Sequence, residues 1–180
     1  MKPWTYTITT VYEKYTMKGP SIFTAVTKAD FELVYSIYMD DSINPYMSFE
    51  KISKKAFQEC FELMTNRDEF VFYLEDGVRV GIYSLIYGKW RKQHVATIGA
   101  LAIFPECQGE GIASRMMGRI FIHLRELNIK RLELIVESDN PKAINLYKKL
   151  GFEIEGTLRA YLKRDSDEAP VDDYFMSLLL

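Results

Sequence analysis

Two glycines, Gly109 and Gly111, stand between an apolar run and an amphipathic run that predicts a helix. The first amides of a helix have no intrahelical partner, and the helix dipole adds positive potential there. Glycine permits the unusual backbone angles and the close approach that a ligand needs at such a point. The backbone N–H groups of Gly109, Gly111, Ile112 and Ala113 could therefore hold a phosphate or pyrophosphate. The same spacing also fits a tight turn without any ligand.

Two common nucleotide-binding motifs do not match this glycine turn. The chain has no G-x-x-x-x-G-K-S/T sequence, which excludes a P-loop NTPase. Ser114 stands where a dinucleotide-binding G-x-G-x-x-G motif needs a third glycine or an alanine. The first strand of the chain also lies elsewhere, so a dinucleotide site of that kind is not expected.

The turn and a segment further downstream together resemble a known enzyme superfamily. Gln108-x-x-Gly111-x-Ala113 is similar to the Q/R-x-x-G-x-G/A acetyl-CoA signature of the GNAT N-acetyltransferases. It follows a Leu-Ala-Ile-Phe-Pro-Glu run that resembles the strand before that signature. The segment from Asn140 to Phe152 resembles the second motif of the family, N-x-x-A-x-x-L-Y-x-x-x-G-F. The two motifs occur in the family's order, with a predicted helix and strand between them.

The resemblance implies that acetyl-CoA is the co-substrate and that no metal takes part. The backbone of Leu101, Ala102 and Ile103 would bind the pantetheine arm, and an amide near Leu101 would polarise the thioester carbonyl. Asn140 would cap its helix and also contact the cofactor. The pyrophosphate would lie against the turn residues Gln108, Gly109, Glu110, Gly111, Ile112, Ala113 and Ser114.

The resemblance also implies the catalytic groups for direct acetyl transfer to a primary amine in a ternary complex. A neutral tyrosine, with a pKa of about 10, can donate a proton to a leaving thiolate, whose thiol has a pKa of about 8.5. Tyr147 matches the tyrosine of the second motif and is the expected general acid. Glu137 is the nearest acidic candidate for the general base. Attack by the neutral fraction of the amine, assisted by a backbone carbonyl and water, is the alternative to that base.

The acceptor is expected to be a small-molecule amine, such as a polyamine, an amino acid or an aminoglycoside-like compound. Relatives that modify protein N-termini carry Glu where this chain has Ile135, which disfavours a protein N-terminal acetyltransferase. Asp40, Asp41 and Glu50 could attract a cationic amine, although loop carboxylates are usually only solvated. A non-catalytic acyl-CoA-binding or regulatory module is the alternative from another functional class. The sequence also leaves open whether acyl groups longer than acetyl are transferred.

The surrounding elements form one α/β domain over residues 22–180, preceded by a 1–21 extension that is either an edge strand or a mobile arm. The resemblance implies a mixed, mostly antiparallel central sheet with splayed central strands and flanking helices. Apolar periodicity and turn residues place four helices, which begin near Thr27, Ser53, Gly111 and Asn140. The expected strands cover residues 22–26, 70–74, 78–87, 94–104, 132–136, 152–161 and 171–180.

The composition excludes several other classes of protein. The 180 residues carry 23 Lys and Arg against 25 Asp and Glu, so the basic excess of a nucleic-acid-binding protein is missing. Two cysteines and two histidines exclude a disulfide scaffold and a His-rich metal centre. Neither a signal-peptide pattern nor a membrane-length apolar run occurs. We therefore expect a cytoplasmic protein without nucleic-acid or membrane partners, as a monomer or homodimer.

Overall fold

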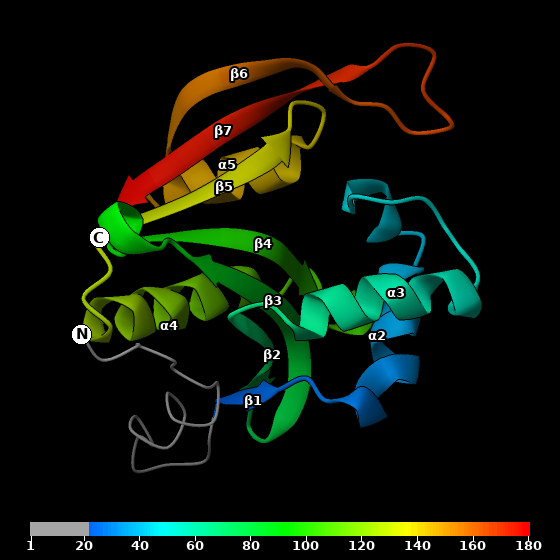
Figure 1. Ribbon diagram of the computed structural model, residues 1–180, viewed down its shortest axis with the longest axis horizontal. Helices are drawn as coiled ribbons and strands as arrows, with labels where there is room; N and C mark the ends of the chain where they lie inside the picture. The colour runs from blue at the N-terminus through cyan, green and yellow to red at the C-terminus, as the bar shows by residue number, and fades with distance from the viewer. Residues whose placement is uncertain (1–21) are drawn as a thin grey trace.

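The structure is a computed structural model that describes residues 22–180. The extension predicted for residues 1–21 lies outside the described residues. Within them, the elements alternate in the predicted order around one seven-stranded sheet (Figure 1). No helix of this described part is long and apolar enough to cross a membrane.

The sheet has the strand order β1-β2-β3-β4-β5-β7-β6. Every neighbouring pair is antiparallel except β4 and β5, which run parallel. This confirms the predicted mixed, mostly antiparallel sheet. Its strands are β1 (Phe23–Ala25), β2 (Glu69–Glu75), β3 (Val78–Tyr87), β4 (Val95–Ile103), β5 (Arg131–Glu137), β6 (Glu153–Leu162) and β7 (Val171–Leu179).

Local signals in the sequence explain where several elements begin and end. The Ser53 hydroxyl accepts a hydrogen bond from the Ala56 amide at the start of α3. Asp76 and Gly77 both have positive φ, as the tight hairpin between β2 and β3 requires. The helices are α2 (Phe31–Tyr38), α3 (Lys54–Thr65), α4 (Ile112–Glu126) and α5 (Pro141–Lys149), and 3₁₀ turns cover Lys28–Asp30, Asn44–Tyr46, Trp90–Lys92 and Pro105–Cys107.

The start of α2 differs from the prediction. We expected Thr27 to cap this helix, but a 3₁₀ turn separates it from Phe31, the first α-helical residue. The Asp30 carboxylate accepts hydrogen bonds from the amide and the hydroxyl of Thr27, at 2.8 and 2.7 Å. The acidic side chain therefore stabilises this turn as an acceptor for Thr27.

Two apolar clusters cover the two faces of the sheet. One cluster lies between the sheet and the helices α4 and α5, and it includes Ile120, Leu132 and Met176. The other lies between the sheet and the helices α2 and α3, and it is rich in aromatic side chains such as Phe57 and Phe72. The first cluster contains residues from both ends of the sheet, whereas the second contains residues only from its N-terminal part.

The central strands β4 and β5 pair over a short distance only. Val95–Thr97 of β4 pair with Arg131–Glu133 of β5, and no pairing follows beyond Thr97. A bulge then interrupts the pairing of β4 with β3, because Ser84 faces Ala100 while Leu85 faces Ile98. Gly99 is the extra residue of this bulge. The strands diverge after these pairs, which confirms the predicted splay.

Candidate active site

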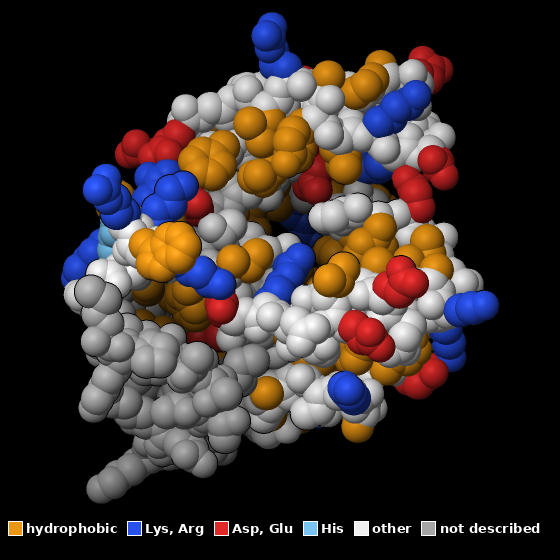
Figure 2. Space-filling model, in the orientation of Figure 1, with side chains coloured by type: hydrophobic (Ala, Val, Ile, Leu, Met, Phe, Trp, Pro, Cys, Tyr) orange, Lys and Arg blue, Asp and Glu red, His pale blue; other side chains and the backbone are white. Residues whose placement is uncertain are grey.

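A pocket of about 290 Å³ lies where β4 and β5 diverge. It is lined from both faces of the sheet, since α3 contributes Cys60 and Met64 while α5 contributes Ala143 and Tyr147. Figure 2 shows this hollow between the part of the molecule that contains β1–β4 and the part that contains β5–β7. Acidic and basic side chains lie at its wall. A small molecule approaching from one face could therefore meet a ligand held on the other.

The glycine turn lies at the start of α4. Gly109 and Gly111 have φ values of 87° and 75°, which an L-residue rarely adopts. The amide of Ser114 donates to the Gly111 carbonyl, at 3.1 Å, so the hydrogen bonding of the helix begins there. The preceding amides lack a helical acceptor. A Cβ atom added at Gly109 would have no neighbour within 4 Å, so this turn is open to a ligand.

The Gln108 side chain connects three segments around the turn. Its Nε2 atom donates to the Ile103 carbonyl at 3.3 Å and to the Ser42 hydroxyl at 3.4 Å. Its Oε1 atom accepts from the Lys142 ammonium at 3.4 Å. These contacts join the start of the turn to the end of β4, to the loop after α2 and to α5. Lys142 adds positive charge next to the open amides, and the cradle as a whole fits a polyanion such as a pyrophosphate.

The predicted pantetheine-binding residues lie at the free edge of β4. Leu101, Ala102 and Ile103 pair with β3 on one side only, opposite Tyr83, Ile82 and Gly81. The Leu101 and Ile103 side chains pack on the α4 side of the sheet, and Ala102 packs on the α2–α3 side. The backbone beyond Thr97 has no partner strand on the β5 side, so it is available to an extended ligand arm.

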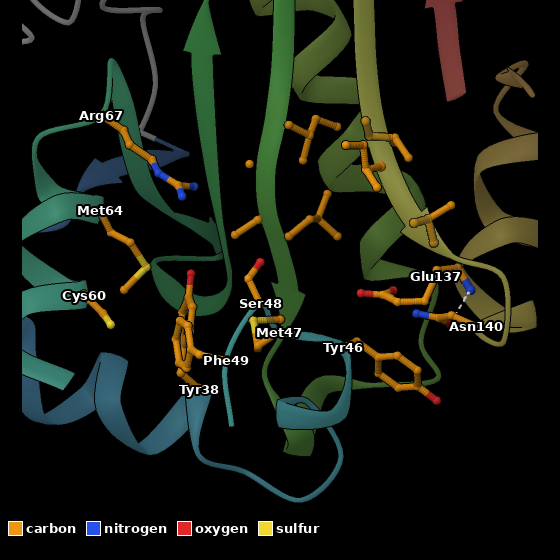
Figure 3. A pocket seen from close by; sticks show the side chains of 18 of the residues that line it. Tyr38, Tyr46, Met47, Ser48, Phe49, Cys60, Met64, Arg67, Glu137 and Asn140 are labelled. Atoms are coloured by element: carbon orange, nitrogen blue, oxygen red, sulfur yellow. Dashed lines mark hydrogen bonds between the residues drawn. The ribbon is translucent and has the colours of Figure 1, made fainter. Parts of the chain in front are cut away.

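The two predicted catalytic residues and Asn140 line one pocket, which also includes Leu101. Tyr147 is 8% exposed and packs against Phe152, with the ring centroids 5.5 Å apart. Asn140 caps α5, because its Oδ1 atom accepts from the Ala143 amide at 3.1 Å. Figure 3 shows the Glu137 side chain pointing into the pocket from β5.

Burial controls the proton affinity of both catalytic candidates. Desolvation raises the pKa of Tyr147 well above its usual value, and the negative charge of Glu137 raises it further. Desolvation also raises the pKa of Glu137, and the Asp173 carboxylate adds to this. A hydrogen bond from its own backbone amide, the Arg164 charge and a hydrogen bond from Asn140 act in the opposite direction without cancelling the shift. The result is a neutral phenol close to a carboxylate with increased basicity.

The acidic residues expected to attract an amine have other partners. Asp40 accepts hydrogen bonds from Ser42, and Asp41 forms an ion pair with Lys51. Glu50 accepts a hydrogen bond from the amide of Asp165 at 2.8 Å. None of the three carboxylates lines the pocket within the described chain.

Several residues that line this pocket were not individually assigned a role from the sequence. Arg67 and Tyr38 line the pocket, as do the four residues from Tyr46 to Phe49 in the loop before α3. Arg164 joins this loop to the β5–α5 loop, because its guanidinium donates to the Pro45 carbonyl and to the Asp139 carboxylate. The isolated Gly99 inside a strand pattern was the available signal, since such a glycine often marks a bulge or a close approach.

Comparison with known proteins agrees with this geometry. A family model described as "Acetyltransferase (GNAT) family" matches residues 31–152. The chain belongs to the GNAT acetyltransferase family. The matched segment includes both predicted motifs and all the residues that line the pocket. Within residues 22–180 of this GNAT protein, no group of three or more His, Cys, Asp or Glu side chains could hold a metal ion.

Two curated relatives act on different small molecules. The chain is 38% identical over 105 residues to the L-amino acid N-acetyltransferase AaaT of Escherichia coli, a match that covers 57% of this chain and 62% of that protein. It is 31% identical over 137 residues to the spermidine N(1)-acetyltransferase of Escherichia coli, which covers 73% of this chain and 72% of that protein. Both names describe N-acetyltransferases, in agreement with an acyltransferase.

Solved structures share the fold at lower sequence identity. The spermidine N-acetyltransferase of Vibrio cholerae in complex with CoA and spermine superposes with a TM-score of 0.73 at 23% identity, covering 87% of this chain and 94% of that one. A phosphinothricin acetyltransferase from Sinorhizobium meliloti in complex with AcCoA gives a TM-score of 0.68 at 20% identity, covering 88% and 87%. These likenesses show that the described residues have the GNAT fold.

Proposed function

We propose that residues 22–180 form an acetyl-CoA-dependent N-acetyltransferase domain that transfers the acetyl group directly to a primary amine of a small molecule. The observation that carries the proposal is the position of Tyr147 and Glu137 in one pocket, at the point where β4 and β5 diverge. The glycine turn, the free edge of β4 and this pocket supply a continuous set of groups for a cofactor and an acceptor. The acceptor then meets the acyl group in a ternary complex.

Three parts of the chain support the binding of acetyl-CoA. The open amides of the turn at Gly109 and Gly111 suit the pyrophosphate, and Lys142 adds positive charge nearby. The backbone of Leu101, Ala102 and Ile103 offers hydrogen-bonding groups to the pantetheine arm. When bound, acetyl-CoA supplies an acetyl group that is activated as a thioester.

Proton transfer is assigned to the buried Tyr147 and the half-buried Glu137. The acceptor arrives as an ammonium, and Glu137 takes its proton, so that the nitrogen lone pair can form the new N–C bond. As the C–S bond breaks, Tyr147 donates its phenolic proton to the sulfur. After the N–C bond forms, the nitrogen loses a second proton to solvent, so the products are an amide, a free thiol and one released proton. The proton held by Glu137 returns to Tyr147. A carboxylate of raised pKa suits the base, and a phenol of raised pKa stays protonated until it is needed.

An acceptor screen that detects released thiol tests the proposal. Amino acids, polyamines and other primary amines are incubated with acetyl-CoA and the full chain. Release of thiol together with an N-acetylated product is the expected result. Binding of acetyl-CoA with no thiol release across the whole panel would instead indicate the non-catalytic acyl-CoA-binding module.

A further inference from the structure

Arg67 brings a cationic side chain to the pocket wall. Its Nη1 atom donates to the Ser84 hydroxyl at 2.8 Å. Within residues 22–180, no carboxylate forms an ion pair with its guanidinium. A guanidinium has five N–H donors in a planar fork, of which Ser84 accepts one. The remaining donors suit the two oxygens of a carboxylate.

The backbone is shaped to admit this guanidinium. A Cβ atom added at Gly99 would lie 2.3 Å from Nη1 and 3.2 Å from Cζ of Arg67. It would also lie 2.9 Å from the Ser84 hydroxyl. Only glycine at this bulge therefore leaves room for Arg67 in its observed position against β3 and β4.

A second donor lies on the same side of the pocket. Tyr38 is 2% exposed, and its buried hydroxyl has no hydrogen-bond partner among the described residues. Figure 3 shows this side chain in the pocket wall on the side of Arg67. Burial raises the pKa of Tyr38, and the charge of Arg67 opposes that shift, so the two groups are close enough to interact. A protonated phenol can donate to an anion but not to an ammonium.

The charges around the pocket distinguish between classes of acceptor. Among the described residues that line it, Arg67 is the one cationic side chain and Glu137 is the one carboxylate. The two enter from opposite sides of the pocket (Figure 3). A polyamine would place a second cation in reach of Arg67, which is unfavourable. A zwitterion would present its ammonium to Glu137 and its carboxylate to Arg67.

We infer that the acceptor is an amino-acid-type compound whose carboxylate is bound by Arg67, with the Tyr38 hydroxyl as a further donor. The inference rests on the proposed function, because it assigns the acceptor of that same site. Arg67 is then a residue that determines substrate specificity, whereas Tyr147 and Glu137 carry out the proton transfers.

The first experiment compares amines that differ only in the carboxylate. Kinetics are measured with the full chain, acetyl-CoA and a panel of amino acids, each paired with its carboxamide, together with spermidine. At least one amino acid should have a kcat/KM about 10- to 100-fold above that of its amide, the range of about 1.4–2.8 kcal/mol expected for one charge-assisted contact. The difference should appear mainly in KM.

Two variants test whether Arg67 causes that preference. Arg67→Gln should lower kcat/KM for the acid about 10-fold or more and remove most of the difference between acid and amide. Gly99→Ala should have the same effect, because the new methyl group displaces the flexible end of Arg67. Arg159→Gln, at an exposed arginine of β6 outside the pocket, is the matched control and should keep the preference.

A binding measurement gives a readout that does not depend on turnover. Calorimetric titration of the preferred amino acid into the protein saturated with CoA should give a dissociation constant that Arg67→Gln raises about 10-fold or more. CoA itself should bind the variant as tightly as the original protein.

The failures of the two proposals are distinguishable. If amines are acetylated but acids and amides react equally, or if Arg67→Gln weakens all acceptors alike, the carboxylate assignment is wrong and the acetyltransferase stands. Rapid acetylation of spermidine without acetylation of amino acids would have the same meaning. If no amine in the panel is acetylated, both proposals fail together.

Discussion

The negative charge of Glu137 raises the pKa of Tyr147, and the two side chains line the same pocket. Neither residue by itself indicates catalysis, because a buried tyrosine and a glutamate at the end of a strand are common in protein structures. Together they form a donor and an acceptor whose pKa values are both raised by burial. This pairing is typical of a site that moves two protons in one reaction.

Removing one hydroxyl tests the proposed general acid. Tyr147→Phe keeps the ring that packs against Phe152 but removes the phenolic proton. We expect kcat to fall about 100-fold or more, as for the loss of a general acid. The dissociation constant for CoA should change less than about threefold. Single-turnover kinetics and calorimetry separate the two effects, and an unchanged chemical rate with several amines would contradict the role of Tyr147.

The pH dependence of kcat/KM tests the proposed base. Glu137 must be deprotonated to accept a proton, and its pKa is raised by burial and by Asp173. Activity should therefore fall as the pH decreases through a value above the ordinary range for glutamate. Asp173→Asn should shift this acidic limb to lower pH, because it removes one neighbouring negative charge.

Substitution of the base itself supplies the control for that profile. Glu137→Gln should remove the acidic limb and lower the rate about 100-fold. If the limb stays at the same pH in Glu137→Gln, another group titrates there and the assignment of the base is wrong.

The glycine turn acts as one element with β4 and α4. Gly109 and Gly111 both have positive φ, and the first amides of α4 have no acceptor within the helix. An L-residue in this conformation costs about 1–2 kcal/mol. The conformation is therefore maintained by the choice of glycine at these two positions.

A matched pair of glycine substitutions separates ligand binding from stability. Gly109→Ala adds a methyl group at positive φ in the open space beside the turn, and it should weaken CoA binding about 10-fold or more. Gly118→Ala adds the same methyl group inside α4, where nothing lies within 4 Å and alanine is the better helix former by about 1 kcal/mol. It should raise the melting temperature without changing the affinity for CoA. Calorimetry and thermal unfolding on both variants provide the comparison, and equal CoA affinity in the two would argue against a phosphate site at this turn.

The elements were more predictable from the sequence than the contacts between them. The strand predicted over residues 94–104 is observed at Val95–Ile103, because apolar runs and a following proline are local signals. The capping of α5 by Asn140 was predicted from the same kind of signal. The hydrogen bond from Arg164 to the Pro45 carbonyl was not predicted, because the two residues are 119 positions apart in the sequence. Arg67 was missed for the same reason, because only the folded sheet brings it next to Ser84.

At the scale of the whole molecule, a histidine and a carboxylate form a buried pair outside the pocket. The Nε2 atom of His123 on α4 lies 2.8 Å from the carboxylate of Glu69 on β2, and Glu69 is only 3% exposed. Burial lowers the pKa of His123, but the hydrogen bond and charge of Glu69 outweigh it, and the charge of Glu126 adds to the upward shift. The folded protein therefore binds this proton more tightly than the unfolded chain does.

This pair predicts how stability changes with pH. A raised folded-state pKa stabilises the protein below the unfolded value of about 6.5, and this contribution is lost as the pH rises through the folded-state value. The melting temperature should decrease by a few degrees from pH 6 towards pH 9, at roughly 2–4 °C per kcal/mol for a chain of this size. Thermal unfolding of His123→Gln should show a flatter profile, and an equal slope in both proteins would exclude His123 as its cause.

Three residue pairs between Val95–Thr97 and Arg131–Glu133 are the only strand pairs described between β1–β4 and the strands β5, β7 and β6, and the amides of Lys130 and Arg131 donate to the His94 carbonyl beside them. Amide hydrogen exchange should reflect this junction, with slow exchange at the three pairs and faster exchange along the unpaired edge of β4. A ligand arm bound along that edge would give the amides there new acceptors. Its binding would also stabilise the folded state by mass action, so cofactor concentration would set how often the two halves of the sheet separate.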